Sequence, residues 1–278
     1  MAGFLSASPK VWAADVAVVR SSDIAPYKAV EQAFTSEIPA TKQLSMAVAG
    51  VDVKAGIAGA NLVLAIGPDA AKAVLAAAPG VPVLVTLAAE SELGAVKPAA
   101  TIPMLVPPAR QVKLIKAFLP AVTRIGFIFD PARTKTLAAE CEAAAKAAGL
   151  TFTKVEVTSR SQVIDAARSL VTKIDALWLV PDSTVVGVDT FKVLVPTTMA
   201  SGVSLIGFTE GMAKTGAVLA IEAGYAESGK RAAEAGRRIL AGQPPNPEAP
   251  DGVVYVNAKS ADLLKAKVSR DGAAKVFE

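Results

Sequence analysis

Short runs of β-branched and aliphatic residues alternate along this chain with longer segments in which apolar residues recur every three or four positions. The first pattern is typical of buried strands and the second of amphipathic helices. Parallel strands need a long crossover, which a helix usually supplies. The alternation therefore predicts an α/β fold with parallel sheets flanked by helices. The predicted strands cover residues 16–20, 43–49, 62–66, 81–86, 124–130, 152–157, 176–180, 204–208 and 217–221.

Helices are predicted between these strands. Pro26 stands where the first turn of a helix tolerates proline, and Tyr27, Val30 and Phe34 then fall on one face. A helix over 136–148 places Cys141 within an apolar stripe, which predicts a buried cysteine. The other predicted helices cover residues 68–78, 110–118, 163–171 and 226–241.

The length and charge of the chain limit the choice of architecture and partner. A chain of 278 residues is longer than one small domain and is long enough for two units. Its hydrophobic content of 52% is sufficient to form folded cores. The 29 basic and 25 acidic residues give a net charge of +4. The basic residues are scattered and lack interleaved aromatic residues that would stack on bases. We therefore expect no nucleic-acid partner.

Histidine is absent and cysteine occurs once, as Cys141. These counts exclude catalysis by imidazole, an internal disulfide, a multi-cysteine metal site and a racemase that uses two cysteines. The segment 211–216 lacks the Gly-Lys-Ser/Thr order of a phosphate-binding loop. We expect no enzyme activity, no cofactor and no metal.

The first 14 residues form an apolar stretch that ends in the small residues Ala13 and Ala14. This pattern resembles the end of an export signal, with a disordered start as the alternative. The expected location is the periplasm. Every run of 18 residues contains a charged residue or a proline, so no segment is expected to span a membrane.

Six segments carry a family resemblance that extends from residue 122 to the C-terminus. They are residues 124–130 (RIGFIFD), 174–182 (IDALWLVPD), 214–220 (KTGAVLA), 224–229 (GYAESG), 239–242 (ILAG) and 255–261 (YVNAKSA). In order and spacing they resemble the substrate-binding proteins of ABC transporters, in the group that includes tryptophan and tyrosine binders.

The resemblance implies a two-lobed type I periplasmic binding fold whose lobes are joined by three hinge crossovers. The first lobe would contain residues 15–120 and 215–245, and the second residues 121–214 and 246–278. A monomer of this kind would bind a small metabolite, such as an amino acid or another polar or aromatic compound, in the cleft between its lobes. It would then deliver the metabolite to a membrane permease.

In open α/β sheets, ligands bind outside the carboxyl ends of the strands. Polar residues at these ends are the candidate ligand contacts: Ser21, Ser22, Asp69 and Thr86 in the first lobe, and Asp130, Asp182, Ser183, Thr209 and Glu210 in the second. Asp182 is the first choice, as the partner of an ammonium or ribose hydroxyl group. Helix capping is the alternative role for Ser22, Asp69 and Ser183, and turn formation for Asp130.

Two other functions share this fold. A periplasmic sensory module would pass the ligand signal to a histidine kinase or chemoreceptor without an importer. The ligand domain of a transcriptional repressor would need a preceding helix-turn-helix, which residues 1–15 are too short to hold.

Overall fold

The computed structural model describes residues 15–39, 42–77, 80–88, 93 and 95–278. The predicted export signal lies outside these residues. The chain divides into two units, each made from two stretches of sequence. Unit 1 contains Met1–Met104 and Gly224–Pro250, and unit 2 contains Leu105–Ala223 and Asp251–Glu278. Both units are α/β structures, as predicted.

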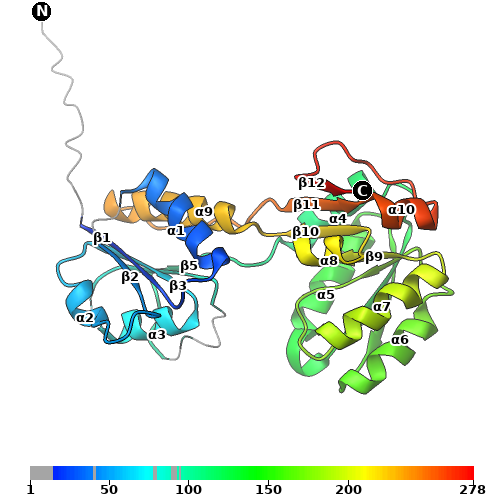
Figure 1. Ribbon diagram of the computed structural model, residues 1–278, viewed down its shortest axis with the longest axis horizontal. Coiled ribbons are helices and arrows are strands. Elements are labelled where there is room, and N and C mark those ends of the chain that lie inside the picture. Colours follow the sequence, from blue (N-terminus) through cyan, green and yellow to red (C-terminus); the bar gives the residue numbers. More distant parts are fainter. Residues whose placement is uncertain (1–14, 40–41, 78–79, 89–92, 94) are drawn as a thin grey trace, which may run out of the picture. The chain divides into compact units, whose positions relative to one another are not determined.

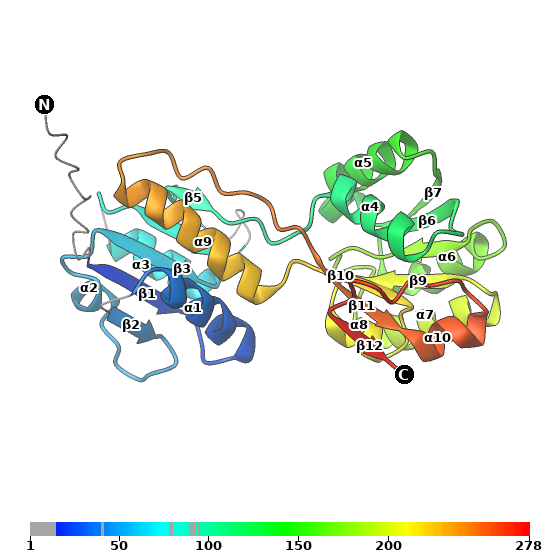
Figure 2. The same ribbon diagram turned by 90° about the horizontal axis from the view of Figure 1, so that it is seen from above.

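Unit 1 is built on a parallel sheet with the strand order β2-β1-β3-β4-β5. Its helices α1 and α9 lie side by side on one face, and α2 and α3 lie on the other (Figures 1 and 2). The central strands are apolar throughout because both of their faces are covered. The elements are β1 (Val16–Arg20), α1 (Ala25–Glu37), β2 (Lys42–Ser45), α2 (Val53–Gly56), β3 (Leu62–Ile66), α3 (Pro68–Ala77), β4 (Val83–Thr86), β5 (Ala100–Thr101) and α9 (Tyr225–Leu240).

Close contact between α1 and α9 depends on small residues of α9. A Cβ atom at Gly229 would collide with the carbonyl oxygen of Val30 and would stand 2.8 Å from the Cβ of Ala33. Ala232 and Ala233 continue this surface into the core that contains Phe34. These small residues therefore allow a late segment of the chain to pack on the first helix.

Unit 2 is built on a sheet with the strand order β12-β11-β10-β9-β8-β6-β7. All its neighbouring pairs are parallel except β10 with β11. The strands are β6 (Arg124–Phe129), β7 (Thr151–Glu156), β8 (Ala176–Trp178), β9 (Ser204–Gly207), β10 (Leu219–Glu222), β11 (Val253–Asn257) and β12 (Lys275–Phe277). The helices are α4 (Pro108–Phe118), α5 (Pro131–Ala147), α6 (Val163–Leu170), α7 (Val188–Ala200), α8 (Glu210–Lys214) and α10 (Ala258–Leu264).

Two apolar cores cover the faces of this sheet. One surrounds Phe127 and Trp178, whose rings meet edge to face with centroids 5.9 Å apart, and includes residues of α4 and α5. Cys141 belongs to this core and is fully buried, as the helical stripe predicts. The other core packs α6 and α7 against alternate residues of the same strands, such as Ile128 and Leu177. Within the described residues, no helix is both long and apolar enough to span a membrane.

The structure places several segments differently from the sequence-based boundaries. Residues 105–120 and 215–223 belong to unit 2, and residues 246–250 belong to unit 1. The reason is packing: Val112 and Ile115 of α4 lie in the core of Phe127, and β10 pairs with both β9 and β11. The predicted strand at 43–49 ends earlier, at Ser45. Helix α7 and the strands β11 and β12 were not predicted.

Candidate functional site

Two buried carboxylates lie side by side at the carboxyl ends of strands β6 and β8. Asp182 is 3% exposed and Asp130 is 6% exposed. The Oδ2 of Asp182 accepts hydrogen bonds from the backbone N–H of Asp130 at 2.8 Å and from the hydroxyl of Thr134 at 2.5 Å. Its Oδ1 accepts from the N–H groups of Thr184 at 3.0 Å and Val185 at 3.3 Å. Four protein donors thus occupy the acceptor positions of this carboxylate.

Each oxygen of the Asp130 carboxylate accepts one hydrogen bond from the protein. Its Oδ1 accepts from the N–H of Ala132 at 2.9 Å and so caps α5, and its Oδ2 accepts from the hydroxyl of Thr184 at 2.6 Å. The hydrogen bond from Thr184, together with that from the Ala132 N–H, lowers the pKa of Asp130. Asp130 is therefore the N-cap of α5, which begins at Pro131, five residues before the predicted start. Its role here is helix capping rather than formation of an isolated turn.

Arg133 is held beside these carboxylates. The hydroxyl of Thr184 donates its proton to Asp130, so it accepts the Nε–H of Arg133, at 3.0 Å. The Nε of Arg133 also lies 3.8 Å from the Oδ2 of Asp130. The side chain is 56% exposed, so its guanidinium group reaches solvent. Arg133 was not among the predicted site residues.

A hollow of about 430 Å³ opens at this edge of unit 2. Arg133 and Ser183 supply its accessible polar groups, and Pro181, Val186 and Phe208 supply its apolar wall. Thr134 and Asp182 complete the lining. The volume lies within the range of small-molecule sites in proteins. The sequence-predicted Asp182 and Ser183 therefore meet in one hollow.

Thr209 and Glu210 lie at the same end of the sheet but do not line that hollow. The hydroxyl of Thr209 accepts from the N–H of Met212 at 3.3 Å and caps α8. The carboxylate of Glu210 forms an ion pair with Lys275 at 2.9 Å, and its N–H donates to Glu222. Both residues thus have local structural partners.

In unit 1, the predicted residues also follow strands of the sheet. Ser21 follows β1; its hydroxyl donates to the carbonyl of Ile66 and accepts from the N–H of Ala70 at 2.9 Å, which ties β1 to α3. Ser22 is half-buried next to it, and Asp69 is exposed in the first turn of α3. Thr86 ends β4 with 0% exposure, and its hydroxyl has no hydrogen-bond partner within the described part of the chain.

A charged network beside Ser21 was missed by the sequence analysis. The Nε of Arg20, the last residue of β1, donates to Asp23 at 2.9 Å, and another guanidinium nitrogen donates to the buried Glu31. The hydroxyl of Ser45 at the end of β2 donates to Asp23 at 2.7 Å. The hydrogen bonds from Ser45 and Arg20 lower the pKa of Asp23. The sequence did hold a signal for this network: Arg20 is a charged residue at the end of an otherwise apolar strand.

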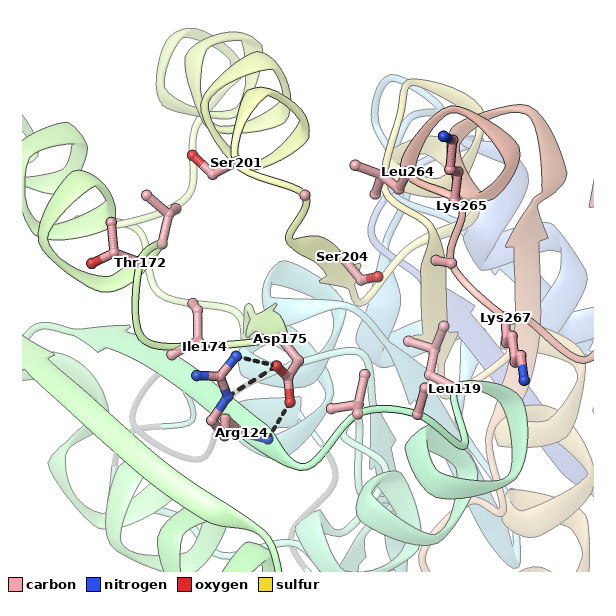
Figure 3. A pocket seen from close by; sticks show the side chains of 15 residues that line it. Leu119, Arg124, Thr172, Ile174, Asp175, Ser201, Ser204, Leu264, Lys265 and Lys267 are labelled. Carbon is pink, nitrogen blue, oxygen red and sulfur yellow. Dashed lines mark hydrogen bonds and ion pairs between the residues drawn. The ribbon is translucent and has the colours of Figure 1, made fainter.

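A larger hollow of about 610 Å³ lies at the opposite edge of unit 2, at the amino ends of β6, β8 and β9 (Figure 3). Arg124 binds Asp175 there through two nitrogens, at 2.6 and 3.0 Å. Asp175 also accepts from the N–H and hydroxyl of Thr123 and from the N–H of Arg124. Burial raises the pKa of Asp175, but these hydrogen bonds outweigh burial and lower it to about 2. The pair ties the start of β6 to the segment that precedes β8.

The order of strands and helices defines the class of this protein. Three solved structures with TM-scores above 0.5 share the fold, which is the two-unit type I periplasmic binding fold. Residues 40–267 match the family model described as ABC transporter substrate binding protein, and the chain belongs to this family.

The solved structures are distant in sequence. A substrate binding protein with adhesive properties from Clostridium difficile, in its ligand-free, open structure, has 18% identity and a TM-score of 0.72, with 95% of this chain and 99% of that chain covered. The ABC domain in complex with L-Trp from Streptococcus pneumonia has 21% identity and a TM-score of 0.60, with the same coverage. A conserved domain protein from Vibrio cholerae has 18% identity and a TM-score of 0.58, with 95% and 100% covered. No protein with a curated description matches the sequence.

Proposed function

We propose that this chain is the solute-binding component of an ABC importer and that it binds a small metabolite at the carboxyl ends of its strands. Membership of the substrate-binding family supports the transport role, and this family consists of binding proteins rather than enzymes. The observation that carries the proposal is the hollow of about 430 Å³ at the ends of β6, β8 and β9, where open α/β sheets bind ligands.

The proposal assigns different roles to the predicted residues. Ser183 is an exposed contact in the hollow, whereas Asp182 and Asp130 hold the surrounding loops in place. In unit 1, Ser22 and Asp69 are the accessible candidates, and Ser21 orients α3. We keep the sequence-based expectation that both units contribute to binding one solute.

The proposed partner is the permease of the importer, and the proposed location is the periplasm. The family supports both, because substrate-binding proteins of this kind capture solute outside the membrane and pass it to a permease. A monomer is the expected form. Fractionation of the producing cells tests the location, and recovery of the protein in the cytoplasmic fraction alone would argue against it.

A thermal-shift screen against amino acids, nucleosides, aromatic acids and polyols tests the function. A compound present at 100 times its dissociation constant stabilises the folded state by about 2.7 kcal/mol, which raises Tm measurably. The expected result is saturable binding of at least one compound, without chemical change to it. Ser183→Ala should weaken that binding, and Ser169→Ala on α6, whose hydroxyl donates to the carbonyl of Ala166, is the matched control. Turnover of the bound compound would refute the proposal.

A further inference from the structure

We infer that the hollow of about 610 Å³ at the amino ends of β6, β8 and β9 is a second ligand site, which binds the phosphate group of a small soluble molecule. Ser204, Lys265 and Lys267 are the proposed contacts. The site lies at the opposite edge of the sheet from the hollow assigned to the transported solute, so the inference does not depend on the proposed function. Its volume falls within the range of small-molecule sites in proteins.

A buried hydroxyl without a protein partner lines this hollow. Ser204 begins β9, and the residue is only 5% exposed. Its N–H donates to the carbonyl of Asp175 at 2.9 Å, whereas its hydroxyl makes no hydrogen bond within the described residues. Figure 3 shows the Ser204 side chain between Asp175 and the segment that holds Lys265 and Lys267. Because buried polar groups are nearly always paired, this hydroxyl indicates a place for a ligand oxygen.

Two lysines stand at the rim of the hollow, on the segment that follows α10 (Figure 3). Lys265 is the C-cap of α10 and has left-handed backbone geometry, with φ 52°, and Lys267 lies two residues further on. The N–H of Ser269 donates to the carbonyl of Phe118 at 2.8 Å, which ties this segment to the end of α4. Both lysines are exposed, and neither forms an ion pair within the part of the chain that the structure describes. Their ammonium groups are therefore available to an anion.

The other charged residues of the hollow are paired with each other. Among the described residues that line it, these are Arg124 and Asp175. The carboxylate of Asp175 accepts two hydrogen bonds from the Arg124 side chain, one from the Arg124 N–H, and two from the N–H and hydroxyl of Thr123. The charges of Arg124 and Asp175 cancel, so Lys265 and Lys267 give the lining a net charge of +2.

Helix ends around the hollow weaken this positive charge but do not cancel it. Helices α4, α6, α7 and α10 all end there, and the C-terminus of a helix carries a partial negative charge. Backbone N–H groups cover part of it. Those of Gly202 and Val203 donate to the last turn of α7, and that of Ala266 donates to the last turn of α10. The remaining partial charges fall off within one turn, whereas each ammonium group carries a full charge, so the hollow favours an anion.

The available groups fit a phosphate better than a carboxylate. A phosphate ester carries a charge of about −1.5 to −2 at pH 7 and three acceptor oxygens, which match two ammonium groups and one hydroxyl. A carboxylate is held best by the planar fork of a guanidinium group, but Arg124 already uses its Nε and one terminal nitrogen on Asp175. The buried side chains of Leu119, Val122 and Ile174 form an apolar floor, which suits the carbon body of an ester.

Calorimetry with phosphate esters tests this inference. The probes are glucose 6-phosphate, glycerol 3-phosphate and inorganic phosphate, beside glucose and glycerol as compounds without a phosphate. We expect saturable binding of at least one ester, no binding of its parent alcohol, and weaker binding as the salt concentration rises. Lys265→Asn removes the charge and keeps the left-handed turn, which asparagine tolerates. This variant and Lys267→Gln should each weaken binding by about tenfold, and Ser204→Ala should weaken it by about threefold or more.

Lys259→Gln is the matched control, because Lys259 is an exposed lysine of α10 that does not line this hollow. An equal loss in Lys259→Gln and Lys265→Asn would overturn the inference, since it would reflect general charge alone. Binding that Ser183→Ala weakens and Lys265→Asn does not would place the phosphate at the carboxyl ends of the strands, against the inference. Binding to phosphatidylglycerol vesicles without binding of any soluble probe would assign a lipid headgroup in place of a small molecule. If no probe binds at millimolar concentration, the second site is refuted and the proposed function still stands.

Discussion

Asp182 accepts a hydrogen bond at 2.8 Å from the backbone N–H of Asp130, and this bond joins the loops that follow two neighbouring strands. The same carboxylate also binds Thr134 and the N–H groups of Thr184 and Val185. Because every donor comes from a loop or helix start at this edge of the sheet, Asp182 holds in place the loops that surround the hollow. A buried carboxylate of this kind stabilises the edge only while all of its donors stay in place.

Asp182→Asn is expected to lower the free energy of unfolding by about 2–4 kcal/mol, since one carboxylate oxygen becomes an NH2 group that faces hydrogen-bond donors. Urea unfolding at neutral pH measures the change. Asp165→Asn, at an exposed ion pair on α6, is the control and should cost less than about 1 kcal/mol. Equal stability of the two variants would show that the four hydrogen bonds of Asp182 contribute little.

The Arg124–Asp175 pair predicts a defined acid sensitivity. The pKa of Asp175 falls from its ordinary value of 3.8 to about 2 in the folded protein. A lowered pKa gives stability that is present above about pH 4 and is lost as the pH falls through 2. Wild type should therefore lose stability between pH 4 and pH 2 more steeply than Asp175→Asn. Unfolding measured across this range tests the prediction, and parallel curves would contradict it.

Gly229→Ala is expected to destabilise unit 1 by about 1–3 kcal/mol, because the added Cβ would collide with the backbone of Val30 on α1. Gly211→Ala on α8 is the matched control. A Cβ there meets nothing nearer than 3.9 Å, so the better helix propensity of alanine should leave stability unchanged or raise it slightly. Thermal unfolding of both variants gives the comparison. A smaller loss for Gly229→Ala than for Gly211→Ala would refute the packing argument.

Cys141 should resist thiol reagents while unit 2 is folded. Burial, followed by the nearby charge of Glu140, raises the pKa of its thiol to about 12, and the side chain is fully covered. The reactive thiolate is therefore scarce at pH 8. Labelling with a chromogenic disulfide should be slow in buffer and complete in denaturant. Ala139→Cys in a Cys141→Ala background places a thiol on the exposed side of α5 and should react at once. Equal labelling rates at the two positions would contradict the burial of Cys141.

The sequence predicted the sheets where strands are continuous apolar runs. Strand β3 is buried along its whole length, so Leu62–Ile66 was recognised with its observed bounds. Helix α7 was missed because its buried face contains Thr190 and Thr198, with Leu194 between them, and it holds Pro196. Threonines that satisfy their hydroxyls within the helix leave no apolar period to detect.

The rule that ligands bind at strand ends predicted Asp130, Asp182 and Ser183 as ligand contacts, and all three lie at one edge of unit 2. Their role as ligand contacts stays a prediction. The rule did not reveal that Asp182 already has four protein donors and Asp130 two, because hydrogen bonds between residues 52 positions apart depend on the folded loops. Arg133 was missed for the same reason: in sequence, a charged residue at the start of a helix resembles an ordinary solvated one.

The buried hydroxyl of Thr86 gives a final test at the carboxyl edge of unit 1. Thr86 has no exposed surface, and its hydroxyl lacks a partner within the described residues, although its carbonyl accepts from the N–H of Gly67 at 2.9 Å. Thr86→Val should therefore raise the free energy of unfolding by about 1 kcal/mol, because it removes an unsatisfied polar group without changing the branched shape. Thr190→Val is the matched control. The hydroxyl of Thr190 both accepts from the N–H and donates to the carbonyl of Gly187, so its loss should cost about 1 kcal/mol. Denaturant unfolding of the two variants should move in opposite directions, and destabilisation by both would mean that the hydroxyl of Thr86 is hydrogen-bonded in solution.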